Sequence, residues 1–309
     1  MNGYEALRSH AAWLDLSTRG KIRVTGEDRA RLLHAMSTND VQNLAAQEGL
    51  YAFFLTAQGR ILADAYLYNL EDSLLLDTEP ETGAKLRDHL DKYIIADDVT
   101  LEDETSQWAA IAIEGPESLS VTAELGIPAP EKKYGVAAWR AGFVARLAST
   151  GPEGVRIFVP SADVAGVVEK LTGLPQASAE EACLVRIENG IPRYGDDISE
   201  RYLVQETQQL HAIHTNKGCY LGQEIVERVR SRGQVHRVLT PIRIHTNTPP
   251  APGTKLTAGG NPVAEISSAV YSPALDEVAA LAYVRTEAAQ GKPEMLVAGA
   301  DPPVSARIG

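Results

Sequence analysis

The chain has 309 residues, of which 44% are hydrophobic and 23% charged, and its formal net charge is −12 at pH 7. This length predicts more than one domain, and the negative charge argues against broad nucleic-acid binding, which needs a basic surface. No apolar run approaches the roughly 18 residues of a membrane-spanning helix, and the first residues lack a signal-peptide pattern, so we expect a cytoplasmic protein without membrane contact.

The N-terminal part alternates strand and helix signals. Residues 22–24 form a short apolar run, which is followed by Thr25 and Asp28 at capping-box spacing and then by a helical pattern. Residues 51–70 contain two apolar runs around an Ala-Gln-Gly turn, which predicts a β-hairpin. Residues 84–95 carry apolar side chains at i, i+4, i+7 and i+8, which predicts a helix.

The opening pattern of strand, glycine, acid and helix recurs near residue 111. The stretch IAIEGPE, starting at Ile111, resembles IRVTGED, starting at Ile22. Two similar α/β subdomains would explain the repeat, and chance over seven residues would also explain it. Further strands are predicted within residues 139–159, followed by two helices, of which the second begins at a capping box of Ser178 and Glu181.

The C-terminal part begins with a composition change after about Leu239. Residues 247–253 read NTPPAPG, a turn-rich break, and short apolar runs alternate with Gly and Pro beyond it. This pattern predicts a small β-barrel. We therefore divide the chain into an α/β region over residues 1–238 and a barrel domain over residues 239–309.

The two cysteines occupy contrasting positions and are too few for a disulfide framework. Cys219 follows Lys217 and Gly218, and a helical pattern begins shortly after it, so the helix N-terminus and the cation would favour a thiolate. The alternative is a loop cysteine without a role. Cys183 lies within an apolar helical pattern, which predicts a buried structural position.

Metal binding has little support in the sequence. His211 and His214 precede Cys219, but no further Cys or His cluster completes a zinc site, and two thiols are too few for an iron–sulfur cluster held by this chain alone. We therefore expect no metal site. Phosphate-binding loops, dinucleotide fingerprints and serine-hydrolase motifs are also absent from the sequence.

Two acidic residues stand out. Glu188 is predicted in the last turn of its helix, where a negative charge opposes the helix dipole and costs about 0.3–1 kcal/mol. It is either a tolerated surface residue or a ligand for a donor-rich heterocycle. Asp64 interrupts an apolar strand, where it is either solvated or functional.

A basic segment surrounds and follows Cys219. Part of it can pair internally, because Glu224 and Arg228 are spaced i, i+4 on the predicted helix. The remaining charges predict a site for a polyanionic small molecule. The segment contains Lys217, Arg228, Arg230, Arg232, Arg237 and Arg243.

The stretch KGCYLGQE, with Arg228 and Arg232-Gly233 after it, resembles the signature of the YgfZ family. These are folate-binding, aminomethyltransferase-like proteins linked to iron–sulfur cluster assembly and repair. The likeness extends through LDLSTRGKIRVTGEDRARLLHAMSTNDV, GRILAD, RIENGIPRYGDDISE, YLVQETQQL and LAYVR. KGCYLGQE is specific to the YgfZ family, whereas the other stretches are shared with the glycine-cleavage T-protein branch.

The resemblance implies an α+β fold, with interleaved ferredoxin-like α/β domains around a folate pocket and a C-terminal β-barrel. It implies tetrahydrofolate or a one-carbon derivative as the cofactor. Catalytic roles fall on Cys219 and Asp64. Binding roles fall on Glu188, which would hold the pterin, and on Lys217, Tyr220, Arg228 and Arg232.

The sequence departs from the T-protein pattern at the hairpin. T-proteins carry an aspartate pair there, whereas this chain has Ala63 before Asp64. Our favoured hypothesis is therefore a tetrahydrofolate-binding accessory protein that supports iron–sulfur enzymes or their assembly factors. The alternatives are a folate-dependent aminomethyltransferase or demethylase, and a binding module that has lost folate.

Overall fold

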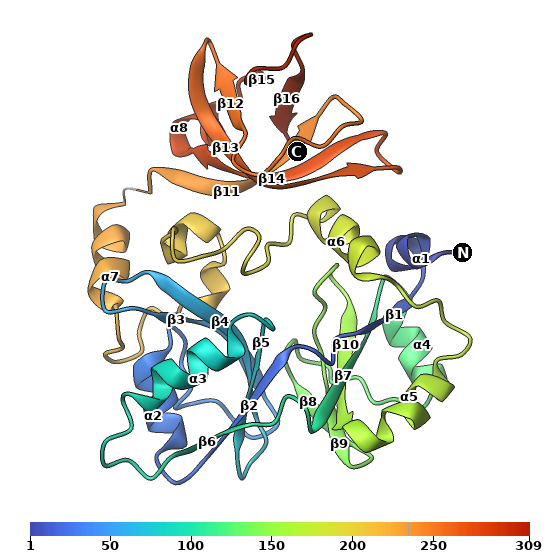
Figure 1. The fold of residues 1–309 in the computed structure, drawn as a ribbon. Coiled ribbons are helices and arrows are strands. Elements are labelled where there is room, and N and C mark those ends of the chain that lie inside the picture. Colours follow the sequence, from blue (N-terminus) through green and yellow to red (C-terminus); the bar gives the residue numbers. More distant parts are fainter. Residues whose placement is uncertain (234) are drawn as a thin grey trace.

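The computed structural model describes residues 1–233 and 235–309, which form two β-sheets side by side with a β-barrel above them (Figure 1). The first sheet has the strand order β3-β4-β5-β2-β6. Helices α2 (Arg29–Met36) and α3 (Gly83–Asp91) accompany it. Its strands are β2 (Gly20–Thr25), β3 (Gly49–Leu55), β4 (Ile61–Asn69), β5 (Leu74–Thr78) and β6 (Thr100–Asp103).

The second sheet has the order β1-β7-β10-β9-β8 and includes the first strand of the chain. In the sequence, β1 precedes all strands of the first sheet, whereas its partner β7 follows them. The two α/β units are therefore interleaved. Helices α4 (Ser118–Glu124) and α5 (Val164–Lys170) accompany this sheet. Its strands are β1 (Ala12–Asp15), β7 (Trp108–Glu114), β8 (Val136–Trp139), β9 (Gly142–Ala145) and β10 (Gly154–Pro160).

The predicted sequence repeat corresponds to a structural repeat. The β2–α2 and β7–α4 units each turn through a glycine with positive φ, Gly26 at 98° and Gly115 at 127°. Both α/β units therefore contain the same strand–glycine–helix turn. The predicted Thr25–Asp28 capping box is wrong, because α2 begins at Arg29 with Asp28 rather than Thr25 as its N-cap residue, and the Asp28 carboxylate accepts a hydrogen bond from Asp98 N at 2.9 Å.

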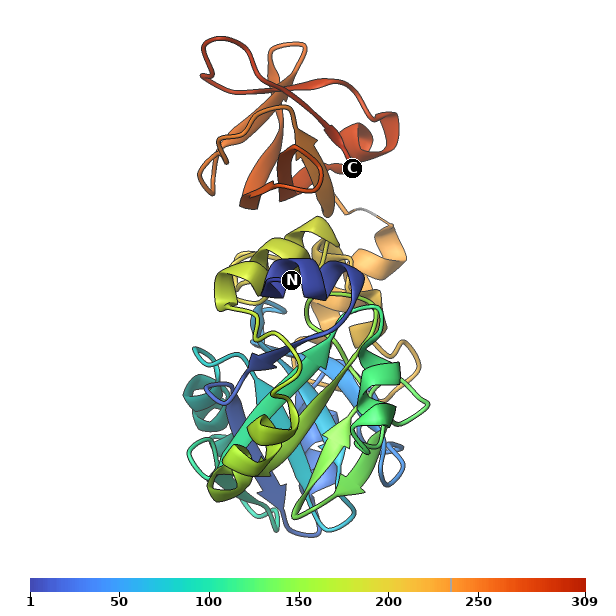
Figure 2. The ribbon, with the colours of Figure 1, turned by 90° about the vertical axis from the view of Figure 1, so that its right-hand side faces the viewer.

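A layer of short helices separates the sheets from the barrel. Helices α1 (Gly3–Ser9) and α6 (Ala179–Glu188) pack side by side in it (Figure 2). The predicted capping box of α6 is confirmed, since Ser178 Oγ accepts from Glu181 N and the Glu181 carboxylate accepts from Ser178 N. The chain then runs through two 3-10 turns, Val204–Thr207 and Leu210–Ala212, into α7 (Gln223–Arg232).

The C-terminal strands close into the predicted barrel, in the order β11-β14-β13-β12-β15-β16. Its core is aliphatic and includes Ile242, Leu256 and Val278. The barrel begins at Arg237, so the division that we drew between residues 238 and 239 falls inside β11. The elements are β11 (Arg237–Ile244), β12 (Lys255–Ala258), β13 (Asn261–Ser272), β14 (Glu277–Arg285), α8 (Thr286–Gly291), β15 (Met295–Val297) and β16 (Ser305–Ile308).

A bulge in β13 attaches the barrel to the α/β body. The register shifts between Ile266 and Ser268, and the hydroxyls of Ser267 and Ser268 donate to Asp197 Oδ1 at 2.7 and 2.6 Å. The other oxygen of this fully buried carboxylate accepts from Arg186 Nη1 at 2.6 Å. Bulges commonly re-aim side chains in this way.

The predicted α+β fold class is confirmed by this architecture. Across the two described stretches, 1–233 and 235–309, the helices are too short or too polar to cross a bilayer.

Candidate functional site

A cavity of about 360 Å³ lies between the two sheets and the helical layer. Its walls come from β1, β3, β4, one side of α6 and the irregular segment 191–196. The side chains that matter for chemistry are polar or aromatic. They are Arg19, Tyr51, Asp64, Tyr66, Glu79, Cys183, Arg186, Arg193, Tyr194 and Asp196.

Asp64 is the buried acid of this cavity, with 7% of its surface exposed. The β3–β4 register pairs Phe53 with Asp64 and Tyr51 with Tyr66, so these side chains share one face of the sheet. The Tyr51 hydroxyl donates to Asp64 Oδ2 at 2.6 Å. Burial and then the nearby charge of Glu79 raise the pKa of Asp64 to about 7. Asp64 can therefore accept or release a proton near neutral pH.

A charge network lies along one wall of the cavity, where Arg19, Glu79 and Arg193 line it, and extends behind that wall to join the two sheets. Arg19 Nε donates to Asp77 Oδ1 at 2.6 Å, and Arg156 from the second sheet also pairs with the Asp77 carboxylate. Burial alone would raise the pKa of Asp77, but the guanidiniums of Arg156 and Arg19 hold it below its ordinary value. The Glu79 carboxylate pairs with both Arg19 and Arg193, and its Oε2 lies 2.9 Å from Arg193 Nε.

Aromatic rings line the space beside Asp64. The ring centroids of Tyr51 and Tyr66 lie 5.1 Å apart, and the Tyr194 hydroxyl is fixed by the carbonyl of Leu62 at 2.6 Å. Aromatic side chains that stand beside placed polar groups are typical of sites for planar ligands. A bicyclic heterocycle with ring nitrogens would find both apolar faces and a carboxyl group here.

Cys183, which the sequence predicted to be buried and structural, lies half-buried on the cavity wall. Its Sγ accepts from Arg186 Nη2 at 3.8 Å, and Arg186 also pairs with Asp196 at 2.9 Å. The helical pattern correctly indicated that this face of α6 points toward the protein. It could not indicate that a cavity lies next to Cys183 on that face.

Glu188, predicted to hold a pterin, lies outside the cavity walls. It binds Tyr4 Oη at 2.7 Å, Arg8 Nε at 2.9 Å and the Ser272 hydroxyl, and 6% of its side chain is exposed. These partners come from α1 and the barrel. Glu188 therefore joins two elements of the scaffold, and its predicted role in holding a pterin stays a prediction.

The KGCYLGQE stretch packs against the end of α2 and the β3–β4 turn, and its Lys217 and Tyr220 do not line the cavity. Lys217 Nζ donates to the carbonyls of Ser37 and Asn39 at 2.6 and 2.7 Å, as well as to that of His34. The Tyr220 ring is buried under Lys217, with Nζ 5.0 Å from its centroid. These two residues fix the loop that carries the cysteine.

Glycines let this loop approach the β3–β4 hairpin. Gly222 has φ of 80°, and a Cβ there would lie 2.6 Å from the carbonyl oxygen of Thr56. At Gly59 in the hairpin turn, φ is 70° and a Cβ would lie 2.6 Å from that of Ile225 on α7. Only glycine fits such positions without strain.

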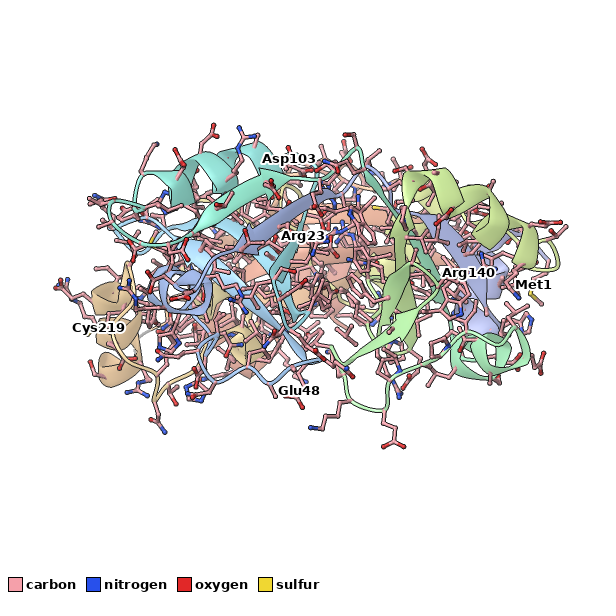
Figure 3. All side chains as sticks on the ribbon, turned by 90° about the horizontal axis from the view of Figure 1, so that it is seen from below. Met1, Arg23, Glu48, Asp103, Arg140 and Cys219 are labelled. Atoms are coloured by element: carbon pink, nitrogen blue, oxygen red, sulfur yellow. The ribbon has the colours of Figure 1, made fainter. Side chains whose placement is uncertain are left out.

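Cys219 is exposed and lies at one edge of the molecule, on the side away from Met1 (Figure 3). Helix α7 begins only at Gln223, and the Lys217 ammonium is engaged by three carbonyls. The structure thus separates Cys219 from Asp64 and from the cavity. Among residues 1–233 and 235–309, no three His, Cys, Asp or Glu side chains converge as metal ligands would.

The predicted basic site is also dispersed. Arg228 pairs with Glu224 at 3.0 Å, as the i, i+4 spacing predicted, and Arg237 pairs with Glu206 at 2.8 Å. Neither arginine lines the cavity. The side chain of Arg232 lies outside the described residues.

Two segments of the chain match known domains. Residues 2–217 match the GCVT N-terminal domain, and residues 237–308 match the glycine cleavage T-protein C-terminal barrel domain. The chain belongs to the glycine-cleavage T-protein family. The narrower likeness to the YgfZ branch rests on KGCYLGQE and stays a prediction.

Relatives in the T-protein family align over most of the chain. The aminomethyltransferase of Streptomyces coelicolor is 28% identical over 297 residues, which cover 90% of this chain and 79% of the relative. An aminomethyltransferase of Thermus thermophilus is 29% identical over 306 residues, 95% of this chain and 85% of the relative.

A solved structure shows the same fold. The crystal structure of the glycine cleavage system aminomethyltransferase T from Bartonella henselae superposes with a TM-score of 0.90. It is 20% identical in sequence, and the match covers 99% of this chain and 87% of that chain.

Proposed function

We propose that the cavity around Asp64 binds tetrahydrofolate or a one-carbon derivative, and that the chain transfers an aminomethyl or related one-carbon group to or from it. The single observation that carries this proposal is a buried carboxyl group, hydrogen-bonded to Tyr51, inside an aromatic cavity of about 360 Å³. This volume is in the range of small-ligand sites. The names of the aminomethyltransferase relatives support the same chemistry.

The residues present fit a reduced folate. The space beside Tyr51 and Tyr66 suits a pterin face, and Asp64 suits its ring N–H groups. A bound folate would supply the nitrogen atoms that carry the one-carbon unit. The cavity excludes bulk water around Asp64, because only 7% of this residue is exposed.

Asp64 supports transfer by moving a proton. An aminomethyl carbon would leave its donor atom for one folate nitrogen and would lose ammonia as a second folate nitrogen bonds to it. The two nitrogens would give up two protons, one to the donor atom and one to the departing ammonia, so no oxidant is needed. A carboxyl group with a pKa of about 7 serves as acceptor and then donor for such a proton. The charge network of Arg19, Glu79 and Asp77 holds the wall rigid during this exchange.

Turnover with tetrahydrofolate and a panel of aminomethyl and methylamine donors tests this proposal. Because general acid–base catalysis contributes about 10²- to 10⁴-fold, Asp64→Asn should lower kcat by about that factor. Tyr51→Phe, which removes only the hydrogen-bond donor, should have a smaller effect. Equal turnover of wild type and Asp64→Asn on every active donor would exclude Asp64 from the chemistry.

A second role is supported by the position of Cys219. Its thiol is exposed in a loop that Lys217 and Tyr220 anchor from behind, so a partner can reach it without entering the folate cavity. Together with the likeness of KGCYLGQE to the YgfZ signature, this supports a cytoplasmic accessory role for iron–sulfur enzymes or their assembly factors.

Complementation tests the accessory role separately from folate chemistry. In cells lacking the gene and placed under oxidative stress, Cys219→Ala should fail to restore iron–sulfur enzyme activity. The same variant, purified, should bind tetrahydrofolate like the wild type, because Cys219 does not line the cavity. Full rescue by Cys219→Ala would exclude a role for the thiol.

A further inference from the structure

The loop between α3 and β6 presents an apolar side chain to solvent. Ile95 is 90% exposed, more than any other large hydrophobic residue in the described stretches 1–233 and 235–309, and Tyr93 beside it is 38% exposed. Ile94, in contrast, packs against the core of the first sheet. Single exposed apolar residues are common on protein surfaces, so Ile95 indicates a binding surface only together with what surrounds it.

The loop is fixed at both ends, which holds Ile95 in place. On the α3 side, the Tyr93 ring packs edge-on against His89, with the ring centroids 5.3 Å apart. On the β6 side, the Asp97 carboxylate pairs with Arg31 of α2. A partner that covers Ile95 therefore meets a preformed surface and loses little affinity to the ordering of the loop.

The segment around Ile95 is strongly acidic. Residues 88–104 contain seven acidic residues and one lysine, a net charge of −6 that is half of the chain's −12. Three of the acids pair with arginines elsewhere in the chain. Asp91 makes no ion pair among the described residues, although it ends α3, where a negative charge opposes the helix dipole. An acid placed at a cost to its own helix, without a partner in the chain, favours a cationic partner from outside.

Helix α2 joins this loop to the loop that carries Cys219 (Figure 1). Its first turn holds Arg31, the partner of Asp97, and the Ala35 carbonyl near its last turn accepts from Leu221 N at 2.9 Å. Arg31 and Ala35 are both exposed and lie on one side of α2, because they are spaced i, i+4. The eight residues of α2 rise by about 12 Å, so one short peptide segment can span both loops.

We propose that this face, which runs from Ile95 along Arg31 and Ala35 to Cys219, docks a partner protein through a segment that carries an apolar side chain among lysines or arginines. The proposal rests on the proposed accessory role of Cys219 and adds the chemistry of the partner. The apolar side chain covers Ile95, and the basic side chains face the acidic segment. The net charge of −12 disfavours nucleic acids, anionic lipids and a second copy of this chain as occupants.

The thiol end of this face is open to such a segment. A Cβ built at Gly218 would meet no atom within 4 Å, and Cys219 next to it is exposed. Docking at Ile95 therefore raises the concentration of the partner segment near the Cys219 thiol.

Disulfide exchange with synthetic peptides tests both ends of the face. Each peptide has about 12 residues, enough to span α2 when extended, and carries a cysteine activated as a mixed disulfide with thiopyridine. The Cys219 thiolate attacks the peptide sulfur, a protein–peptide disulfide forms, and thiopyridine leaves with the thiol proton, so no further oxidant is needed. The peptides are a lysine peptide with a central leucine, the same peptide with serine for leucine, and a glutamate peptide with the leucine. The rate measured with Cys219→Ala is subtracted.

The lysine–leucine peptide should react with the wild type at least about tenfold faster than either other peptide, because covering an apolar side chain corresponds to about tenfold or more in affinity. Ile95→Ser should remove the preference for leucine over serine. Leu296→Ser is the matched control and should keep this preference, because Leu296 is a 43% exposed leucine of the barrel, far from α2 in the chain.

A second pair of variants tests the charge. Asp91→Lys should slow both lysine peptides severalfold more than Glu124→Lys does. Glu124 is the matched control, because it is an exposed acid that ends α4 on the second sheet, and its replacement changes the net charge equally. The difference between the two variants should shrink in high salt, which screens exposed charges.

Three outcomes overturn this inference. They are an equal preference for leucine in the wild type and Ile95→Ser, a glutamate peptide that reacts as fast as the lysine peptide, and a dimer of the wild type that Ile95→Ser dissociates, which would show that a second copy covers the face. Each of them leaves the proposed role of the thiol intact. Full rescue by Cys219→Ala in the complementation test refutes that role instead.

Discussion

Replacing Asp64 with asparagine should stabilise the protein at neutral to alkaline pH. The folded-state pKa of Asp64 is raised from 3.8 to about 7, chiefly by burial. The folded protein therefore holds the Asp64 proton more tightly than the unfolded chain does. The resulting contribution to the free energy of unfolding is fully present below about pH 4 and is lost as the pH rises through about 7. A rise of about three units at about 1.4 kcal/mol each gives a penalty of about 4 kcal/mol for the wild type at about pH 8. Asparagine avoids this penalty and keeps an oxygen for the Tyr51 hydroxyl.

Urea unfolding of both proteins, followed by circular dichroism between about pH 5 and about pH 8, measures this effect. The free energy of unfolding of Asp64→Asn minus that of the wild type should grow with pH, by on the order of 2–4 kcal/mol across the range. Other titrating groups are common to both proteins and cancel in the difference. A difference that stays constant with pH would refute the raised pKa and, with it, the proton-transfer role of Asp64.

Three further predictions follow from the same geometry. Asp77→Asn should lower the free energy of unfolding by about 3–5 kcal/mol, because it leaves the buried guanidinium of Arg156 without a carboxylate and that of Arg19 with Glu79 alone; an unchanged Tm would contradict this. Saturating tetrahydrofolate should slow the alkylation of Cys183 by iodoacetamide but not that of Cys219, as peptide mass spectrometry would show; equal protection of both thiols would argue against the cavity as the site. Gly59→Ala should lower the free energy of unfolding in urea by about 1–3 kcal/mol more than Gly126→Ala does. Both glycines have positive φ, but only a Cβ at Gly59 would meet a close neighbour, Ile225 on α7. Equal losses would show that α7 does not pack closely against the hairpin.

Most of the fold was predictable from local patterns, because these patterns depend on neighbouring residues. The Ser178–Glu181 capping box and the hairpin around Gly59 require only contacts within a few residues, and both are confirmed. The predicted Thr25–Asp28 box is wrong because the helix begins only after Asp28, whose carboxylate accepts a hydrogen bond from the backbone N–H of Asp98, 70 residues away. Such competition between local and tertiary partners is not visible in a single sequence.

The site was less predictable, because it depends on long-range geometry. Asp64 stood out as an acid in an apolar strand, but its partner Tyr51 is identified only by the β3–β4 register. Glu188 stood out equally, yet its hydroxyl partner Tyr4 lies 184 residues away in the chain. Cys183 was predicted to be structural because a helical pattern shows only that a side chain points inward. The pattern does not show whether that side chain meets packed protein or a cavity.

Calorimetric titration with tetrahydrofolate tests the central claim, that the cavity beside Asp64 is the folate site. The most direct comparison is between the wild type and Ala182→Phe, which fills the cavity from α6, with Ala123→Phe on the exposed face of α4 as control. We predict that the wild type and Ala123→Phe bind, and that Ala182→Phe retains its Tm within a few degrees but does not bind. Equal binding by all three proteins would place the folate elsewhere and contradict the account.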